Sequence, residues 1–257
     1  MAGFDTVELA KFRFPERRLS RPLPGSITQV KKMKFSSAYL PFVAVMALVV
    51  VASNILVQFP VAGQIGALSL ADLLTWGAFT YPFAFLVTDL ANRRYGPEMA
   101  RRVVFAGFMV AVACSILIPP LMFRYGLIGF DTAADRLARI AIASGSAFLL
   151  AQLLDITVFN RLRRQSWWRA PVIGSLAGSV LDTAMFFTVA FSSAFAFIGP
   201  DDAFALEAAP LLGVLPVEAA RWMSWALGDL AVKLLIAVFA LIPYRLIAAR
   251  WSQPAVA

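Results

Sequence analysis

The sequence predicts an all-α integral membrane protein, a six-transmembrane-helix bundle with its N-terminus and C-terminus in the cytosol. Hydrophobic residues make up 60% of the 257 residues and charged residues only 15%, and the mean hydropathy is +0.76. An ordinary water-soluble domain does not have this composition. Acidic residues inside several of the apolar stretches indicate that the bundle has a polar interior.

Six apolar stretches follow one another along the chain, each near the ~20 residues that cross a ~30 Å hydrocarbon core. We predict membrane-spanning helices over residues 40–59, 74–90, 103–121, 140–159, 172–197 and 222–246. All six Trp residues fall near the ends of these stretches, where an indole ring can lie among the lipid headgroups with its N–H in water. The spans and the aromatic residues therefore support the same assignment.

The positions of the basic residues predict the orientation. With a cytosolic N-terminus, the inner segments hold 18 of the 23 Lys and Arg residues and the outer segments hold four, while Lys233 lies inside the last stretch. Lys and Arg concentrate on the cytosolic side of membrane proteins. We therefore expect both termini in the cytosol.

Two parts are expected: a basic cytosolic tail over residues 1–37 and a six-helix transmembrane domain over residues 38–250. Residues 11–34 carry eight Lys or Arg and one acid, without the apolar run of a signal peptide. The tail acts either as a topology signal or as a contact with anionic lipid of the bilayer. We expect no nucleic-acid partner, because the net charge of +8 comes from basic residues clustered at helix ends.

The residue types that are absent exclude several chemistries. The chain has no histidine and a single cysteine, Cys114, which lies in an apolar run and is expected to be a small core residue. A Ser-His-Asp or Cys-His centre, a His/Cys zinc site and a bis-His haem site are thus excluded. Neither a phosphate-binding Gly-Lys-Ser/Thr loop nor a dinucleotide fingerprint is present. We predict no enzyme, no catalytic residue, no metal and no cofactor.

Five ionisable residues lie inside the predicted spans: Asp89, Asp155, Asp182, Asp229 and Lys233. Each costs about 2.5–3.5 kcal/mol at a helix centre, so such groups usually face a polar cavity and mark a path for a ligand, ion or proton. Asp229 and Lys233 are spaced i,i+4 and can neutralise each other. They form either a self-contained ion pair or a pair that also contacts a substrate.

The other three acids differ in their sequence surroundings. Asp89 and Asp155 are each followed within a few residues by arginines, so they either lie at the cytosolic interface or serve in gating or proton coupling. Asp182 has no basic residue within a helical turn. It is therefore the better candidate for a carboxylate that meets a ligand or a proton.

Neutral polar residues within the spans include Asn54, Gln58, Thr80, Gln152, Thr183 and Thr188. They either join helices through hydrogen bonds or line a site. Pro82 removes a backbone hydrogen bond, so we predict a kink in the second span. Small residues over 174–179 allow close helix packing, within the bundle or between protomers, and a homodimer stays open.

An ordered set of motifs resembles the bacterial queuosine-precursor transporters, also called the vitamin uptake transporter family. The resemblance covers about residues 38–247. The motifs are Asn54-Ile-Leu-Val-Gln58-Phe-Pro60, Leu74-Thr-Trp76-Gly-Ala-Phe-Thr80-Tyr-Pro82-Phe, Thr88-Asp89-Leu, Gln152-Leu-Leu-Asp155-Ile-Thr-Val-Phe-Asn160-Arg161, Trp167-Trp168, Asp182-Thr183 and Asp229-Leu-Ala-Val-Lys233. The basic tail and the Pro-rich outer segment 200–216 do not match the family pattern.

The resemblance implies a multi-pass protein of the cell inner membrane that imports 7-cyano-7-deazaguanine and 7-aminomethyl-7-deazaguanine for tRNA modification. A carboxylate can accept the N1–H and the exocyclic amine of a guanine-like edge, and a Lys or an amide can donate to its carbonyl. Phe79, Tyr81, Phe186 and Phe187 could stack on the base. The expected substrate-binding residues are Asn54, Gln58, Trp76, Thr80, Gln152, Asp182, Asp229 and Lys233.

Three functional classes remain open. The first is a stand-alone secondary carrier, which we favour. The second is the substrate-binding subunit of an ATP-driven vitamin importer, but Ala44, Ala47 and Ala52 on the first span include no pair with the spacing of the Ala-x-x-x-Ala docking motif. The third is a non-transport membrane scaffold, in which the internal acids would be purely structural.

Overall fold

The computed structural model describes residues 39–251, so the predicted basic tail lies outside the described residues. The described chain is mostly helical, with two short antiparallel strand pairs. The α-helices are α1 (Leu40–Leu56), α2 (Gly77–Thr80), α3 (Phe83–Tyr95), α4 (Pro97–Arg124), α5 (Ala134–Leu162), α6 (Arg169–Phe191), α7 (Ala203–Leu206), α8 (Arg221–Phe239) and α9 (Leu241–Trp251). The strands are β1 (Gln64–Ile65), β2 (Leu68–Ser69), β3 (Ala208–Pro210) and β4 (Glu218–Ala220), and the 3₁₀ helices are η2 (Ser193–Phe195) and η3 (Leu211–Gly213).

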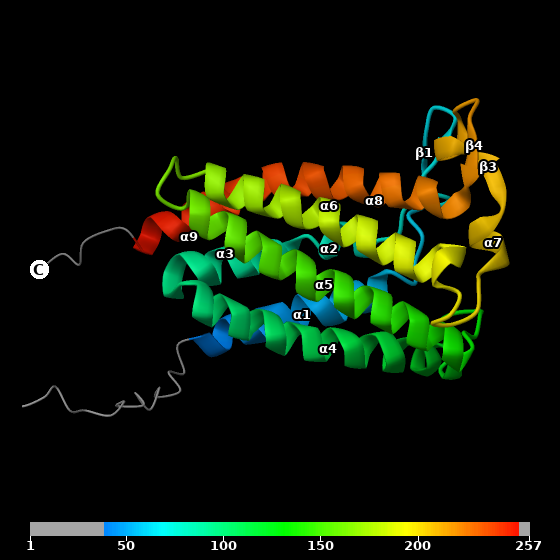
Figure 1. The fold of residues 1–257 in the computed structure, drawn as a ribbon, viewed down its shortest axis with the longest axis horizontal. Coiled ribbons are helices and arrows are strands. Elements are labelled where there is room, and N and C mark those ends of the chain that lie inside the picture. Colours follow the sequence, from blue (N-terminus) through cyan, green and yellow to red (C-terminus); the bar gives the residue numbers. More distant parts are fainter. Residues whose placement is uncertain (1–38, 252–257) are drawn as a thin grey trace, which may run out of the picture. The chain divides into compact units, whose positions relative to one another are not determined.

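Helices α1, α4, α5, α6 and α8 run alongside one another in Figure 1. Helix α5 packs against both α4 and α6, α1 packs against α4, and α6 packs against α8. Large apolar side chains on the outer faces are exposed, among them Leu48, Met109 and Leu235. Apolar faces of this kind in a helical bundle are typical of contact with lipid. The chain is thus an all-α membrane protein, as predicted.

Four helical segments are long and apolar enough to cross a membrane: α4, α5, α6 and the continuous segment Arg221–Trp251, which contains α8 and α9. They correspond to the third, fourth, fifth and sixth predicted spans. Helix α1 is apolar but has only 17 residues. Six crossings of the membrane and the orientation of the termini stay predictions.

The second predicted span is not one helix. Residues 74–90 contain the four-residue helix α2 and the start of the 13-residue helix α3, separated at Tyr81 and Pro82. Proline has no N–H to donate to the carbonyl four residues earlier, and tight i→i+3 bonds follow, with Ala84 N–H donating to the carbonyl of Tyr81. The helix is interrupted at Pro82, where the sequence predicts a kink, and the prediction of a single helix across 74–90 is wrong.

The fifth predicted span is too long at its outer end. Helix α6 ends at Phe191, where Ser192 turns to extended backbone and its hydroxyl accepts a hydrogen bond from the N–H of Ala194 at the start of η2. A serine side chain satisfies a free N–H at a helix start in this way, which favours a new turn over continuation of the old helix. Residues 192–197 therefore belong to the connection between α6 and α7.

The junction between α3 and α4 shows why this sequence reverses direction here. Gly96 has φ +86°, a conformation that glycine adopts at little cost, and it terminates α3. Pro97 then occupies the first turn of α4, where its missing N–H is no loss, and Glu98 complements the positive helix end. The sharp turn brings α4 back along α3.

Two strand pairs lie together at the end of the bundle away from α9 (Figure 1). Strand β1 pairs with β2, and β3 pairs with β4 with Ala208 opposite Ala220. Helix α7 and η3 belong to the same outer segment as β3 and β4. We call residues 192–220 the cap. The sequence analysis predicted no strands, because runs of two or three residues are too short to show an alternating pattern.

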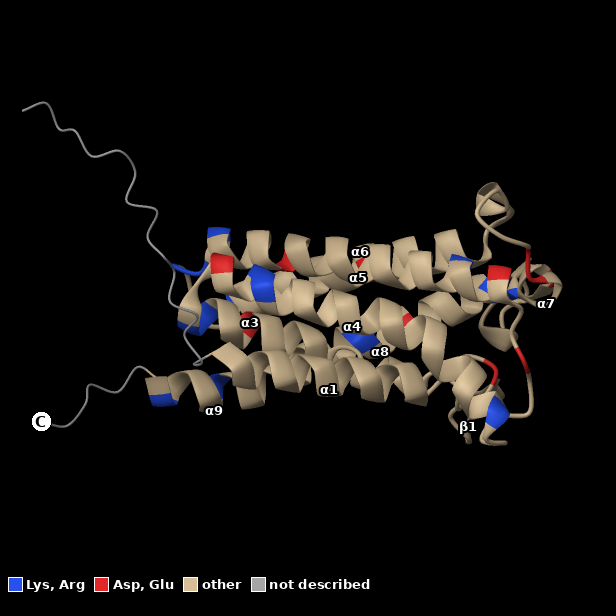
Figure 2. Ribbon diagram, turned by 90° about the horizontal axis from the view of Figure 1, so that it is seen from below, with Lys and Arg blue, Asp and Glu red and all other residues tan. Residues whose placement is uncertain are grey.

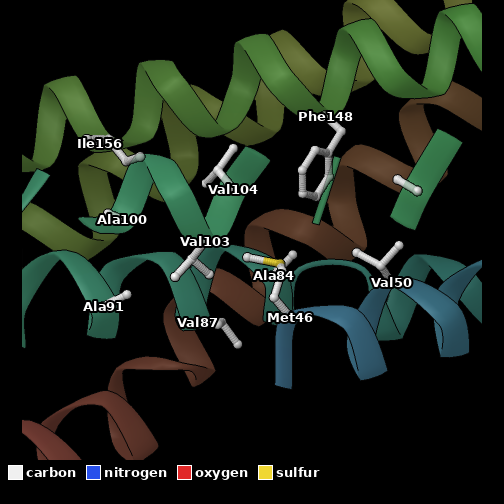
Figure 3. Packing of buried hydrophobic residues seen from close by; sticks show 11 residues of the cluster. Met46, Val50, Ala84, Val87, Ala91, Ala100, Val103, Val104, Phe148 and Ile156 are labelled. Carbon is white, nitrogen blue, oxygen red and sulfur yellow. The ribbon is translucent and has the colours of Figure 1, made fainter. Parts of the chain in front are cut away.

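The main apolar cluster joins α1, α3, α4 and α5 (Figure 3). Met46 and Val50 of α1 face Val103 and Val104 of α4, with Phe148 of α5 beside them. A side chain at position 107 of α4 would collide with Met46, so the glycine there permits the close approach of α1.

The charged residues separate between the two ends of the bundle (Figure 2). The turn between α3 and α4, the turn between α5 and α6, and α9 carry arginines, whereas the acidic residues of the connections lie mainly at the end that bears the cap. This distribution agrees with the prediction that most basic residues lie in the connections at one end of the bundle.

Candidate functional site

A cavity of about 670 Å³ lies at the centre of the bundle. Residues of α1, α2, α4, α5, α6 and α8 line it, and the cap contributes Phe204, Pro210 and Leu212. Pockets for small organic molecules usually measure about 300–1,000 Å³ and have mostly apolar walls with a few polar groups. The cavity has this size and this composition.

Lys233 is the centre of the polar groups in the cavity wall. Its Nζ lies 2.6 Å from Oδ2 of Asp182 and 2.5 Å from Oδ2 of Asp229, and it donates to Oγ1 of Thr183 at 3.1 Å. The Thr183 hydroxyl in turn donates to Oδ2 of Asp229 at 2.8 Å. The predicted i,i+4 pair of Asp229 and Lys233 is confirmed, and α6 supplies a second carboxylate. We call Lys233, Asp182 and Asp229 the lysine cluster.

Tyr81 connects the break in the second span to the lysine cluster. Its hydroxyl donates to Oδ1 of Asp182 at 2.8 Å, and Nζ of Lys233 lies 5.1 Å from the centre of its ring. Phe148 contacts the same ring edge-on. Both oxygens of Asp182 are therefore occupied by partners from the protein.

Asp229 differs from Asp182 in what it leaves open to the cavity. Its contacts with Lys233 and Thr183 both use Oδ2, so the described residues leave Oδ1 available to a ligand. The side chain of Asp229 is 15% exposed, compared with 5% for Asp182. Asp229 is thus the carboxylate better placed to accept hydrogen bonds from a bound molecule.

Aromatic side chains form another part of the wall. Phe186 and Phe187 of α6 line the cavity, together with Phe191 and Trp225, which contact each other edge-on at 5.4 Å between ring centres. Flat aromatic faces favour planar ligands, with base stacking worth about 1–3 kcal/mol per base. The cavity combines a charged end with walls suited to a flat ring.

A second, neutral polar group comes from α1 and α4. Asn54 donates to the carbonyl of Val50 and accepts from the Ser115 hydroxyl at 3.1 Å, and Ser53 shares a hydrogen bond of 3.0 Å with Thr80. Ser53, Asn54 and Ser115 line the cavity, as does Gln58. Sequence analysis missed Ser53 and Ser115, because serine is common in helix interfaces and carries no distinctive spacing.

The structure brings together five of the eight residues predicted to bind substrate: Asn54, Gln58, Asp182, Asp229 and Lys233 line the cavity. Thr80 does not line it but supports Ser53. Trp76 precedes α2 and is about half exposed, and its ring contacts Phe79. Gln152 lies elsewhere, beside Asp155.

Asp89 and Asp155, predicted for gating or proton coupling, lie in a separate buried group. Asp89 is 2% exposed and accepts a hydrogen bond from the Ser175 hydroxyl at 3.2 Å. Asp155 is fully buried, and Gly174 of α6 lies against its side chain. Neither carboxylate forms an ion pair within residues 39–251. Of the two alternatives that the sequence leaves open, ion pairing with the nearby arginines is thus not seen for either acid in the described residues, and a role in gating or proton coupling stays a prediction.

The cap is attached to α5 by a buried arginine. Arg139 is fully buried and donates to the carbonyls of Val189, Ser192 and Gly199 and to Oδ1 of Asp201 at 3.0 Å. The hydrogen bond from Arg139 lowers the pKa of the Asp201 carboxyl below its ordinary value. These bonds fix the outer end of α6 next to the cavity.

The lysine cluster offers acceptor and donor groups for a polar edge, but the described residues do not form a metal site. Across 39–251, no group of three or more Asp, Glu, Cys or His side chains is placed to hold an ion of this kind. The carboxylates, the hydroxyl groups and the amide of Gln58 in the cavity wall suit an organic molecule with hydrogen-bonding groups.

Comparison with known proteins identifies the family. The model of the family described as "Putative vitamin uptake transporter" matches residues 75–247. The chain belongs to this family. The transporter is 40% identical over 200 residues to a queuosine precursor transporter of Escherichia coli (strain K12), covering 76% of this chain and 79% of the relative.

Two further relatives have related names. A "Probable queuosine precursor transporter" of Haemophilus influenzae is 40% identical over 56% of this chain and 65% of its own length. One of Bacillus subtilis is 29% identical over 46% of this chain and 56% of its own length. No solved structure matches the chain. Family membership and the apolar helices together make the transporter a multi-pass protein of the inner membrane.

Proposed function

We propose that the transporter imports 7-deazaguanine bases, the 7-cyano and 7-aminomethyl precursors of queuosine, and that the central cavity is their binding site. The relatives named as queuosine precursor transporters supply the substrate class. The observation that carries the proposal is the lysine cluster at the end of a cavity with aromatic walls. The proposal is transport by a stand-alone carrier, without chemical conversion of the cargo.

The guanine-like edge of these bases fits the hydrogen-bonding groups of the lysine cluster. The N1–H and the exocyclic amine are neighbouring donors, and Oδ1 of Asp229 is the open acceptor. The ring carbonyl is an acceptor that the amide of Gln58 could serve, since the three N–H groups of Lys233 already have partners. Phe186 and Phe187 supply faces for stacking. Adenine has the opposite donor and acceptor pattern at this edge and would leave buried groups unpaired, which costs about 1–3 kcal/mol.

The same proposal includes six membrane crossings with both ends in the cytosol. Helix α1 and the α2–α3 pair supply the two crossings beyond the four long helical segments. A short broken helix is acceptable at membrane depth where it lines a cavity, and Gly77, Ala78 and Tyr81 do line the cavity. The arginines at the α9 end support a cytosolic location for that end. A homodimer stays a prediction.

The decisive experiment measures binding to the purified protein in detergent. Thermal stabilisation by 7-cyano-7-deazaguanine is compared with guanine, adenine and riboflavin, because ligand at 100 times its dissociation constant adds about 2.7 kcal/mol. We expect a selective shift for the deazaguanine, reduced at least tenfold in apparent affinity by Asp229→Asn.

The matched control is Glu98→Gln, the same loss of a carboxylate at an exposed position of α4. It should bind like the unmodified protein. Absence of a shift with any deazaguanine would overturn the proposed substrate class. A normal shift in Asp229→Asn would move the site away from the lysine cluster.

A further inference from the structure

A second polar group, with no role in the proposed substrate site, is buried where α3, α5 and α6 meet. It comprises Thr88, Asp89 and Asn92 of α3, Gln152 and Asp155 of α5, and Ser175 and Ser179 of α6. We call these residues the inner cluster. Asn92 Nδ2 points to the carbonyl of Ile156, and the Ser175 hydroxyl donates to Asp89, so side chains of α3 reach both other helices.

Most of the polar atoms of the inner cluster have no hydrogen-bond partner. The unpaired atoms are Thr88 Oγ1, Asp89 Oδ1, Asn92 Oδ1, both side-chain atoms of Gln152, both carboxylate oxygens of Asp155, and Ser179 Oγ. Buried polar groups in native proteins are nearly always paired, so an accumulation of this size at one place calls for a function. Gln152 is fully buried and stands one turn from Asp155 on the same face of α5.

A small space opens next to the inner cluster. Its volume is about 10 Å³, and Asp89, Ser175 and Ser179 line it together with Lys233 and Tyr244. This is about the room that a single water molecule needs, and the walls offer several polar partners. Ser179 is 1% exposed, and its unpaired hydroxyl borders this space. Lys233 lines both this space and the central cavity.

Charges in the bundle interior do not balance. The lysine cluster has two carboxylates for one ammonium group, and the inner cluster adds two carboxylates with no ion pair among the described residues. Asp89 and Asp155 are both buried, on helices α3 and α5, which pack against each other and against α6. Two carboxylates in such surroundings do not remain ionised together, because burial of an unpaired charge is far more costly than uptake of a counter-charge.

We propose that the inner cluster is a proton-binding site that couples import to the proton gradient. The carboxylate of Asp155 or Asp89 takes a proton that enters from the outside, becomes a neutral carboxylic acid, and releases the same proton to the cytosol. The amide of Gln152 and the hydroxyl of Ser179 pair with either form, since each can both donate and accept. The proposal rests on the proposed function, because it assigns the coupling ion of that import.

The charged and titratable groups that face the inner cluster come from each neighbouring helix. Lys233 of α8 and Tyr244 of α9 line the shared space, and the guanidinium groups of Arg93 and Arg163 lie on the side of Tyr244. Lys233 is held by its two carboxylates. The net charge around Lys233 therefore decides how strongly the inner cluster holds its proton, and this provides the connection to a bound substrate.

The test uses the full-length protein in proteoliposomes that contain a pH-sensitive dye. Uptake of labelled 7-cyano-7-deazaguanine is measured with an inward proton gradient, with an inward sodium gradient at equal pH, and as exchange against internal unlabelled base. We expect the proton gradient alone to drive accumulation, with acidification inside. Asp155→Asn should lose accumulation and acidification by at least tenfold yet retain exchange, and Glu98→Gln should behave like the unmodified protein.

Each outcome separates the two proposals. Absence of exchange in the unmodified protein would contradict the proposed function itself. Exchange with accumulation driven by sodium, or by neither gradient, would leave the function intact and overturn proton coupling. Normal proton-driven accumulation in both Asp155→Asn and Asp89→Asn would also overturn it. If one variant fails to assemble, exchange by the other shows that the bundle is intact.

Discussion

The lysine cluster and the inner cluster both contain two aspartates within the bundle, but the partners of their carboxylates differ. In the lysine cluster, Asp182 and Asp229 share the ammonium group of Lys233 and receive hydroxyl hydrogen bonds from Tyr81 and Thr183. In the inner cluster, Asp155 has no partner for either oxygen. Carboxylates held by an ammonium group and hydroxyl groups have fixed positions and can recognise a ligand. Buried carboxylates without such partners are expected to bind and release a proton instead.

The largest effect should come from removing the shared ammonium group. Lys233→Met keeps the length of the side chain but leaves two buried carboxylates without a cation, and loss of one partner of a buried ion pair costs about 3–5 kcal/mol. We expect a large drop in the temperature of thermal unfolding in detergent at neutral pH. By contrast, Asp155→Asn should cost little stability, because neither oxygen of Asp155 has a hydrogen-bond partner to lose.

A second substitution separates charge from packing in this result. If the charge is the cause, Asp182→Asn added to Lys233→Met should restore part of the lost stability. If the double variant is less stable than Lys233→Met, the comparison between the two clusters fails, since the cost would then come from packing alone.

A middle-sized effect is expected where α6 meets the inner cluster. In Gly174→Ala the added Cβ would collide with Oδ1 of Asp155 and press on its backbone carbonyl, so α5 and α6 must separate slightly. Overpacking of this kind costs about 1–3 kcal/mol. Thermal unfolding should show the loss, and the proton-driven uptake should fall more than exchange does.

The matched control for this substitution is Gly129→Ala. Gly129 lies in the exposed connection after α4, and a Cβ there would meet no atom within 4 Å. Its unfolding temperature should stay within a degree or two of the unmodified protein. An equal drop in unfolding temperature in the two variants would show that the collision with Asp155 is not the cause of the loss in Gly174→Ala.

The smallest effect concerns the cap and is a dependence on pH. Because the hydrogen bond from Arg139 lowers the pKa of Asp201 in the folded protein, this carboxylate contributes stability above its ordinary pKa near 4, and the contribution is lost as pH falls through the lowered value. Asp201→Asn should therefore unfold at a slightly lower temperature at pH 6, and its difference from the unmodified protein should shrink as the pH falls below about 4. A difference that stays constant below about pH 4 would assign the role of Asp201 to packing.

The sequence predicts the membrane helices well and their interruptions poorly. Hydropathy alone locates the four long segments, because about 20 apolar residues in a row carry the signal themselves. The sequence also indicates that Lys233 and Asp229 form a pair, since residues spaced i,i+4 lie next to each other on one helix. The partnership of Lys233 with Asp182 cannot be read in this way, because 51 residues separate them and only the packing of α6 on α8 joins them.

The same reasoning explains which site residues were misplaced. Gln152 was grouped with the substrate site because the sequence does not show which buried polar group an amide joins. In the structure it is buried one turn from Asp155 on α5 and does not line the cavity. For Asp89 the sequence leaves open a location beside its neighbouring arginines, whereas in the structure its carboxylate accepts a hydrogen bond from Ser175 of α6, 86 residues away in the chain. The neighbour of a buried polar side chain depends on the helix face that carries it. Periodicity alone does not predict that face for α3, because the helix is interrupted at Pro82.

The charge of the cavity wall also bears on which ligands the cavity can accept. The cavity wall carries three acidic side chains, Asp72, Asp182 and Asp229, and two basic ones, Lys233 and Arg221, which leaves an excess of one negative charge when all are ionised. A nucleotide would bring its phosphate charges against this excess, while a free base brings none. We therefore expect the cavity to favour a free base over the corresponding nucleotide.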